Sequence, residues 1–247
     1  MKAFSLKKFL FKGMVMLGFV FILLIGFMLN PSLSYAHQSQ IGGLSVFHNE
    51  ALSAEIKEII IDSNQFLLSS PLANPKSQIC LNEGIYPKVI KALMGPDVIR
   101  AFRHTNVVLG ELKDKNRLES RGHSFGFAQF LAHARVHNQQ YAHHGFWDAN
   151  PLGGYPEWKW EGFADYVVLG SKYKLEEIWK AYQSHEDNSY VFVDLGEGEG
   201  SLKLHIRFLL LTKYCFEEKG MDYQSFMELS MEEEDVWQEI KEKFAEA

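Results

Sequence analysis

The chain has 247 residues, of which 47% are hydrophobic and 14% aromatic, enough to bury the core of one sizeable domain. Its net charge is −6, with 31 acidic against 25 basic residues, and no basic stripe runs along it. Because binding to phosphates needs a basic face, the composition argues against a nucleic acid as partner.

The first 36 residues differ from the rest of the chain. Four lysines, the last of them Lys12, precede an uncharged apolar run over residues 13–29. A basic start, an apolar run and small residues at Ser34 and Ala36 are typical of a secretory signal cleaved after Ala36. The run is also long enough to span a bilayer. Residues 1–36 are therefore interpreted as a signal peptide or as a membrane anchor that holds through residues 9–29, with a buried core helix as a third interpretation.

Signal and anchor both place residues 37–247 outside the cytoplasm, because the lysines stay on the cytoplasmic side. The expected location is the cell membrane with an extracytoplasmic domain, or a secreted or periplasmic location if the leader is removed. Cys80 and Cys215 lie in this part of the chain. An oxidising compartment permits a disulfide between them, and their apolar neighbours equally fit two separate buried thiols.

Strands and helices alternate in the first half of the chain. Hydrophobic spacing and turn residues predict a strand in 43–50, a helix over 50–68, a turn at 70–75, a strand in 77–82, a helix over 86–94 that ends at Gly95-Pro96, a strand in 105–110 and an exposed loop over 113–124.

Longer helices dominate from Ser124, which is expected to cap a helix that runs through His137. A loop rich in glycine and proline is predicted over 145–156. Further helices are predicted over 158–169, 174–184 and 199–219, and the last helix is expected to open with a capping box at Ser230. The predicted fold class is α+β, with a small mixed sheet first and a mainly helical half second, within one domain over 37–247.

The stretch LAHARVHNQQ, residues 131–140, carries His133 and His137 four residues apart. Residues at i and i+4 lie on the same side of a helix, so both imidazoles can reach one metal ion. The chain has 10 histidines, and two of them on a half-buried helical face also fit a pair that simply packs. The pair needs a third ligand before it predicts a metal site.

The candidate for that ligand is in EWKWEGFADYV, residues 157–167. Glu161 would complete a set of two histidines and one glutamate and leave a fourth position for water, which is the pattern of catalytic zinc. Asp165, one helical turn further, can accept a hydrogen bond from a ligand histidine and hold its ring. Trp158 and Phe163 indicate a largely buried helix, where an unpaired carboxylate is costly. On an exposed face, both acids would be ordinary solvated charges.

The segment from Phe130 to Tyr166 resembles the core of the gluzincin zinc metallopeptidases, and the chain is similar to small bacterial proteins of that type with an apolar amino-terminal segment. The family carries His-Glu-x-x-His on one helix and a glutamate ligand on the next, commonly in Pro-x-Trp-x-x-Glu-Gly-x-Ala-x-Tyr. The matching residues are Pro156, Trp158, Glu161, Gly162, Ala164 and Tyr166, with Gln140 in a frequent continuation of the histidine helix and Trp160 as an addition.

The resemblance implies zinc bound by His133, His137 and Glu161, with Asp165 behind one of the histidines. It also implies a glutamate as general base directly after the first histidine, where this chain has Ala134. Loss of a general base typically lowers a rate by about 10²–10⁴-fold, while a bound metal would still lower the pKa of water. The site is therefore expected to bind zinc and to hydrolyse little.

Other residues are candidates for the missing roles. His143, His144 and Glu157 stand near the site in sequence and are candidate substitute bases. His205 and Arg207, in LKLHIRFLL, are candidate oxyanion stabilisers. Each also fits an ordinary polar residue of a loop or a surface.

These features favour an extracytoplasmic, membrane-tethered protein with a gluzincin-like domain over 37–247. Zinc is its expected cofactor and a peptide or protein its expected substrate or ligand, with weak or no peptidase activity. One alternative is an active zinc metallohydrolase that uses a substitute base. The other is a metal-free structural or interaction module whose histidines pack.

A reporter fused after residue 36 should lie outside the cytoplasmic membrane, because four lysines and no acidic residue precede the apolar run. Activity of paired reporters that work only inside or only outside the cytoplasm measures this. A signal from the cytoplasmic reporter would overturn the expected location, and the mass of the mature amino terminus distinguishes an anchor from a cleaved signal.

Overall fold

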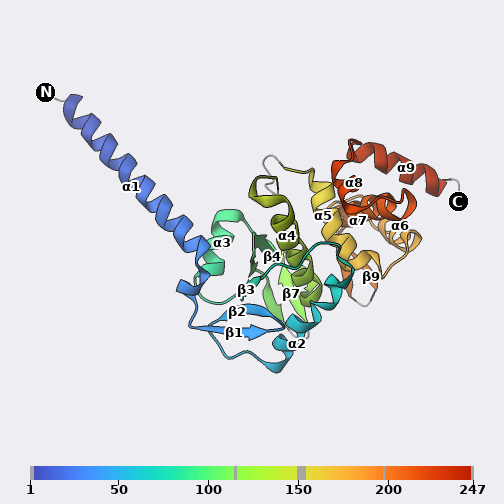
Figure 1. The fold of residues 1–247 in the computed structure, drawn as a ribbon, viewed down its shortest axis with the longest axis horizontal. Helices are drawn as coiled ribbons and strands as arrows, with labels where there is room; N and C mark the ends of the chain where they lie inside the picture. Colours follow the sequence, from blue (N-terminus) through green and yellow to red (C-terminus); the bar gives the residue numbers. More distant parts are fainter. Residues whose placement is uncertain (1–2, 114–115, 149–153, 197, 246–247) are drawn as a thin grey trace.

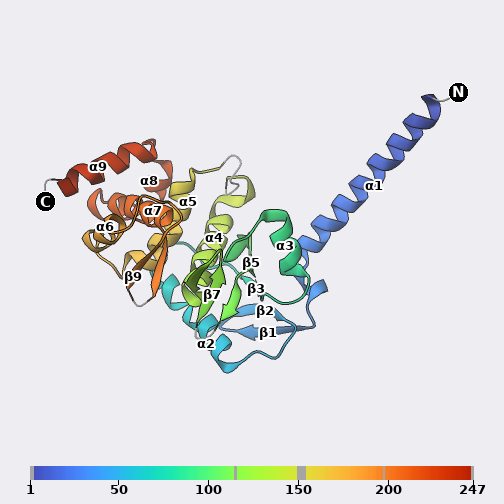
Figure 2. The same ribbon diagram turned by 180° about the vertical axis from the view of Figure 1, so that it is seen from behind.

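The α+β class predicted from the sequence is confirmed: a small mixed sheet is followed by a mainly helical half, and an apolar helix precedes both (Figures 1 and 2). The computed structural model describes residues 3–113, 116–148, 154–196 and 198–245.

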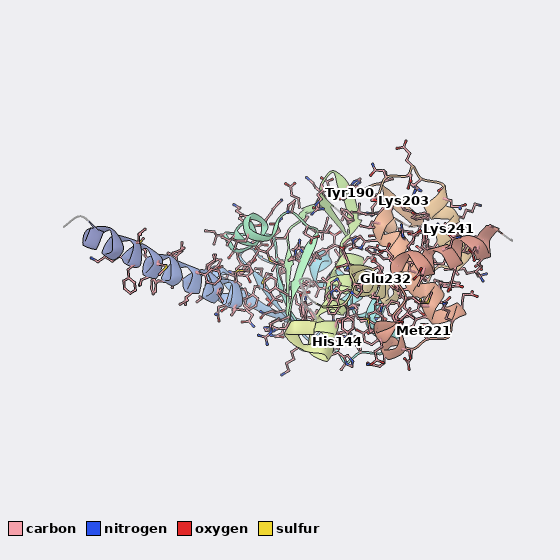
Figure 3. All side chains as sticks on the ribbon, turned by 90° about the horizontal axis from the view of Figure 1, so that it is seen from above. His144, Tyr190, Lys203, Met221, Glu232 and Lys241 are labelled. Atoms are coloured by element: carbon pink, nitrogen blue, oxygen red, sulfur yellow. The ribbon has the colours of Figure 1, made fainter. Side chains whose placement is uncertain are left out.

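Helix α1, Ala3–Leu29, extends away from the rest of the molecule (Figure 3). Its segment Leu10–Leu29 has a mean hydropathy of 2.4 and is not buried against the protein. This is the described helix that is long and apolar enough to cross a membrane, as an anchor or as a signal sequence. A short 3-10 helix, Pro31–Ser34, connects α1 to the sheet.

The main sheet has the order β1-β2-β3-β5-β4, with β2, β3 and β5 parallel and the two edge strands antiparallel to their neighbours. The strands β2 (Leu44–His48), β3 (Gln78–Cys80) and β5 (Thr105–Val108) were predicted. The edge strands β1 (His37–Ile41) and β4 (Ile99–Phe102) were missed, because their side chains are mostly polar or only partly buried. A Gly42-Gly43 turn, with φ of 57° and 84°, closes the β1–β2 hairpin.

Two connections pack on the sheet. The first is α2, Ala54–Asp62, which Ser53 caps by accepting a hydrogen bond from the amide of Ile56, followed by a 3-10 helix, Gln65–Ser69. The predicted helix over 50–68 is therefore shorter and broken. The second is α3, Tyr86–Met94, which ends at Gly95 with a φ of 84°. That end agrees with the prediction from Gly95-Pro96.

The expected exposed loop over 113–124 is wrong for its described residues. The strands β6 (Glu111–Lys113), β7 (Arg117–Ser120) and β8 (His123–Gly126) form an antiparallel sheet there. Leu118 pairs with Phe125, and both are buried although Leu118 stands between two charged residues in the sequence. Cross-strand pairing decides such strands, and it is invisible in a local pattern.

The predicted helix over 199–219 begins too early. The strands β9 (Phe192–Gly196) and β10 (Glu199–Leu202) form a hairpin at its expected start. Helix α7 covers only Lys203–Lys213 and is followed by a π-helical turn, Tyr214–Glu218. Gly200 lies so close to the partner strand that a Cβ there would be 2.0 Å from the carbonyl oxygen of Val193. The glycine thus allows the hairpin rather than weakening a helix.

The histidine-bearing helix is α4, Phe127–Asp148. Ser124 does not cap it, because Ser124 pairs with Glu119 in the β7–β8 hairpin. Asn116 caps the helix instead: its side-chain oxygen accepts from the amide of Ala128 at 2.7 Å. The helix passes Gly145, whose φ of 80° kinks it inside the expected loop, and residues 149–153 of that loop lie outside the described part of the chain.

The helical half consists of α5 (Glu157–Asp165) with a following π-helical turn (Tyr166–Gly170), α6 (Leu175–Gln183), α7, α8 (Tyr223–Glu228) and α9 (Glu233–Ala245). The predicted capping box at Ser230 is not formed, since α9 begins at Glu233. The amide of Glu232 donates to the side chain of Asp235 at 3.3 Å, so the start of the helix is capped two residues later than expected.

Helix α4 lies between the two main hydrophobic clusters. Leu131 and Ala134 pack with the sheet and α2, whereas Ala132 and Val136 pack with the helical half. Residues on a third side of α4 are left for a cleft. The helix is therefore the element that joins the two halves of the fold.

Cys80 and Cys215 are two separate buried thiols, so the disulfide alternative is wrong. Cys80 lies under α3, and Cys215 lies in the core of the helical half. Burial raises the pKa of both thiols, that of Cys215 to about 11, so neither is a reactive thiolate at neutral pH.

Gly162 sets the distance between α5 and α7. A Cβ on Gly162 would lie 2.3 Å from Thr212 Oγ1 and 2.6 Å from the carbonyl oxygen of Phe208. Any side chain would force the helices apart. Since α5 carries Glu161 and Asp165 and α7 carries His205, this contact also determines how these groups meet.

Gly162→Ala should lower the free energy of unfolding by about 1–3 kcal/mol, the usual cost of overpacking a core. Urea unfolding followed by circular dichroism measures it. Gly126→Ala is the control, because a Cβ there would meet its nearest neighbour at an ordinary 3.5 Å. Equal stability of the two variants would contradict the close packing.

Candidate metal centre

One side of α4 lines a cleft of about 510 Å³ between the two halves of the fold. The residues on that side are Phe130, His133, His137 and Tyr141, which recur at helical spacing. Facing them are residues 97–101, which lead into β4 and form most of it, on one wall. Trp160, Glu161 and His205 lie on the other wall. The two predicted histidines therefore open into a cavity and not into a packed core.

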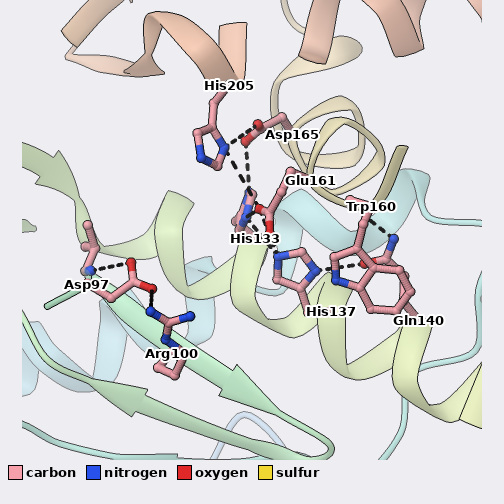
Figure 4. A network of polar contacts seen from close by, with 10 residues as sticks. Asp97, Arg100, His133, His137, Gln140, Trp160, Glu161, Asp165 and His205 are labelled. Carbon is pink, nitrogen blue, oxygen red and sulfur yellow. Dashed lines mark hydrogen bonds and ion pairs between the residues drawn. The ribbon is translucent and has the colours of Figure 1, made fainter. Parts of the chain in front are cut away.

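His133 is held by Asp165 (Figure 4). Its Nδ1 lies 2.9 Å from Asp165 Oδ1, and the other carboxylate oxygen lies 3.2 Å from His205 Nδ1. The side chain of Asp165 is only 4% exposed. Because a carboxylate accepts, His133 donates from Nδ1, and in its neutral form Nε2 keeps a lone pair directed into the cleft.

His137 is oriented by its own helix and by α5. Its Nδ1 lies 2.8 Å from Gln140 Oε1, while Gln140 Nε2 donates to the carbonyl oxygen of Trp160 at 3.1 Å. The amide orientation makes Nδ1 of His137 the donor, so Nε2 again keeps a lone pair. The imidazole stacks on Trp160 with an interplanar angle of 6°. Both histidine rings thus direct their Nε2 atoms toward the same point in the cleft.

Three acceptor atoms meet at that place (Figure 4). Glu161 Oε2 lies 3.1 Å from His133 Nε2 and 3.3 Å from His137 Nε2, and the two nitrogens are 3.1 Å apart. Two lone pairs and a carboxylate oxygen repel one another unless a cation joins them. A proton or a metal ion is what this arrangement can bind.

The electrostatics of the cluster agree with this. Burial lowers the pKa of His133, but Asp165 and Glu161 outweigh it and raise the pKa to about 10. Burial raises the pKa of Glu161, but His137 and His133 hold it well below the usual value. The carboxylates thus keep their charge and attract a cation.

His205 belongs to the same cluster. His133, Glu161 and His205 each offer one ligand atom, and these atoms lie within 4.8 Å of one another, so the three residues could hold a metal ion. His205 Nδ1 is 3.9 Å from Glu161 Oε2 and closer to Asp165. The set that contains His137 is tighter. Despite its burial, contact with Asp165 raises the pKa of His205, which favours its role as a cation or donor beside the site.

Arg207 was a candidate oxyanion stabiliser, but its side chain lies away from the cleft. Its guanidinium lies 3.0 Å from Glu233 and 2.8 Å from Glu234, and it covers the ring of Trp237 on α9. Two residues along a helix turn the side chain by about 200°, which directs Arg207 away from His205.

Of the three candidate substitute bases, the structure places only Glu157 at the cleft. His144 Nε2 lies 2.7 Å from the hydroxyl of Tyr223, and the His143 ring contacts His144 and Tyr223, so both side chains face α8. Neither lines the cleft. Glu157 does line it, on the exposed rim at the start of α5.

Ala134 is buried, with 1% of its surface exposed, and packs toward the sheet rather than lining the cleft. It lies between Phe130 and His137 on the helix surface, since it is four residues after one and three before the other. A longer side chain would have to emerge between these two cleft residues. The methyl group of Ala134 has no such reach and contributes no acid or base.

Sequence reasoning missed Tyr141 and Arg100. Tyr141 follows His137 by one helical turn, a spacing that was available as a signal. Burial and Glu161 raise its pKa, against the influence of Arg100. Arg100 pairs with Asp97 at 2.8 Å on the opposite wall, and its place in the cleft depends on the unpredicted strand β4.

Comparisons of the chain with family models, with curated proteins and with solved structures give no match. The geometry and chemistry of the site itself therefore carry the evidence for function.

The metal-free protein should lose stability as the pH rises from about 7 to 10. The folded pKa of His133, about 10, exceeds its ordinary value of 6.5, so its contribution is complete below pH 6.5 and is lost as the pH rises through 10. Asp165→Asn removes the charge that raises this pKa most, so its stability should fall less over the same range. Urea unfolding with chelator across this pH range measures both, and parallel curves would contradict the assignment.

Proposed function

We propose that this protein is a membrane-tethered, gluzincin-like zinc protein that binds peptide segments in its cleft and hydrolyses them weakly or not at all. The observation that carries the proposal is the meeting of His133 Nε2, His137 Nε2 and Glu161 Oε2 at separations of 3.1–3.3 Å. Ligand atoms bound tetrahedrally at about 2.0–2.1 Å from zinc are themselves about 3.3 Å apart. The resemblance of residues 130–166 to the gluzincin core supports the same ion.

The residues fit zinc by chemistry as well as by spacing. Two imidazoles and one carboxylate are a donor set of catalytic zinc sites, and each histidine has an oriented second nitrogen. His133, His137 and Glu161 would hold the ion, while Asp165 and Gln140 fix the rings. Zinc bound in this way acts as a Lewis acid and lowers the pKa of water.

The chain's own acid–base groups support weak catalysis. Ala134 offers no proton acceptor, and Asp97 is paired with Arg100. His205 is positioned to donate a hydrogen bond to negative charge that develops on a peptide carbonyl. Positioning and charge stabilisation are thus present without the usual base.

An extended peptide suits the cleft because β4 is an edge strand of the main sheet. Residues 98–101 line the cleft, so this edge strand borders the same cavity as the histidines. Edge strands bind peptides by adding a strand through main-chain hydrogen bonds. Phe130, Tyr141 and Trp160 supply apolar surface for alternate side chains.

A retained anchor accounts for the packing after α1 better than a cleaved signal does. Phe27, Met28 and Tyr35 pack against a core cluster under α3, and the Tyr35 hydroxyl donates to the carbonyl oxygen of Leu81 at 2.7 Å. Cleavage after Ala36 would remove all three residues from this cluster. We therefore propose that α1 stays as a membrane anchor with the cleft outside the cytoplasm.

An active hydrolase with a substitute base is the second candidate. The observation that favours it is the exposed carboxylate of Glu157 on the cleft rim. In that case chelator-sensitive hydrolysis by the wild type would be robust, and Glu157→Gln would lower it by about 10²–10⁴-fold.

The purified protein should bind one zinc ion per chain, measured by elemental analysis and by competition with a chromophoric chelator. His133→Ala, His137→Ala and Glu161→Ala should each weaken binding beyond the about 10–100-fold effect expected for Asp165→Asn, which acts behind a ligand. Arg207→Ala and His143→Ala are matched controls and should bind like the wild type. Absence of zinc from the wild type would exclude the proposal and favour the metal-free module.

Ala134→Glu should bind zinc and gain measurable hydrolysis of unstructured peptides, because it restores a carboxylate next to the first histidine. Ala134→Gln is the control: it has the same size and must emerge between the same neighbours, but it cannot accept a proton at neutral pH. Peptide cleavage by the two variants and the wild type, with and without chelator, measures this, once circular dichroism shows that both variants fold. Equal activity of the glutamate and glutamine variants would contradict a base at this position.

A further inference from the structure

Exposed apolar side chains gather where α1 joins the domain. Of the large hydrophobic residues after α1 that the structure describes as exposed, half lie there: Leu33 at 75%, Ile85 at 61%, Leu93 at 50% and Met94 at 41% exposure. Large exposed apolar side chains that gather on one part of a domain mark a surface that meets something other than water.

The patch is built on α3. Tyr86, Pro87 and Ile90 bury one side of this helix against the sheet, while Lys88, Lys91 and Leu93 are exposed. The helix contains two lysines and no acidic residue. The nearby acid, Glu83, is turned inward, where its carboxylate accepts from the backbone amides of Asn49 and Glu50. The exposed part of α3 thus combines apolar and basic groups, which suits contact with an anionic membrane surface.

Direct contacts join this patch to α1. The hydroxyl of Tyr86, the first residue of α3, donates to the carbonyl oxygen of Met28 at 2.6 Å, and its ring lies 5.5 Å from that of Phe27. A Cβ on Gly84 would lie 3.7 Å from the carbonyl oxygen of Ser34, which places the loop before Ile85 beside the segment that carries Leu33. Figures 1 and 2 show α3 next to the domain end of α1 from both sides.

We propose that α3 and Ile85 form a lipid-contacting face that rests on the outer leaflet of the bilayer, beside Leu33 and the point where α1 leaves it. This inference rests on the proposal that α1 is retained as an anchor. The occupant is the lipid surface itself, because the patch continues from a helix suited to that bilayer and its lysines complement anionic headgroups.

Contact of α3 with lipid would also determine where the cleft lies relative to the bilayer. Asp97 lines the cleft and follows Met94 by three residues, which span at most about 11 Å even when fully extended. Contact of α3 with the bilayer would hold the β4 wall of the cleft near the lipid surface. The peptides that it reaches most readily would then be segments of membrane proteins close to the bilayer.

Site-specific quenching tests this in the full chain reconstituted into vesicles that contain an anionic lipid and a brominated phosphatidylcholine. Cys80 and Cys215 are fully buried, so a thiol-reactive fluorophore labels one introduced cysteine at a time. Leu93→Cys tests the face, Leu33→Cys reports on the anchor, and Leu68→Cys is the control at a residue that is 80% exposed on another part of the molecule.

The expected result is quenching at positions 33 and 93 but not at position 68. Quenching at 33 without quenching at 93 would overturn the lipid-contacting face and leave the anchor in place. No quenching at 33 would overturn the anchor and, with it, this inference. Quenching at all three positions would indicate non-specific adsorption and also count against it. Shielding of the probe at 93 in detergent without lipid would assign the patch to contact between protein molecules instead.

The lysines provide a second measurement that leaves the fold of α3 intact, since both side chains are exposed. Each should contribute about fivefold to the equilibrium between contact and release on an anionic surface. Lys88→Glu together with Lys91→Glu should therefore reduce quenching at position 93 on anionic vesicles, while quenching at position 33 stays unchanged. Identical quenching at 93 in both proteins would overturn the electrostatic part of the proposal.

Discussion

The carboxylate of Asp165 connects the three helices that build the site. One oxygen accepts from His133 on α4 and the other from His205 on α7, while the residue itself belongs to α5. A buried carboxylate without such partners would cost several kcal/mol, so the two histidines and the aspartate require one another. These contacts lower the pKa of Asp165 and raise the pKa values of both histidines, although burial acts in the opposite direction on all three. The rest of the cluster is arranged around this contact.

The fold supports the contact from two directions. Gly162 lets α5 approach α7 closely enough for Asp165 to reach His205, and Asn116 fixes the start of α4 at the end of a hairpin. Helix α4 then has one side on the sheet, one on the helical half and one in the cleft. This division explains why His133 and His137 are directed into a cavity while Ala134, beside them, is buried. A site between two packed halves is also held rigidly, which favours ligand binding.

The arrangement separates holding a ligand from acting on it. Asp165 and Gln140 each hydrogen-bond the Nδ1 of one histidine and so direct its Nε2 toward Glu161, where a proton or a metal ion must join the three atoms. The acid–base part of the site is sparse by comparison, with one rim carboxylate at Glu157 and no polar group at position 134. The packing of Phe27, Met28 and Tyr35 against the cluster under α3 connects the end of the apolar helix to the domain.

Local patterns in the sequence determined several features by themselves. The apolar helix follows from an uncharged run, and His133 and His137 share a helical side because their spacing of four residues requires it. Glu161 and Asp165 were identified by the same periodicity together with the aromatic residues around them. The tertiary structure decided the rest. Strands β4 and β6–β10 form through pairing partners that a local pattern does not contain, and with them came Arg100 and the second wall of the cleft. Arg207 and His205 looked equivalent in sequence, and only the docking of α9 on one side of α7 and α5 on the other separated them, because a helix presents different sides to different neighbours.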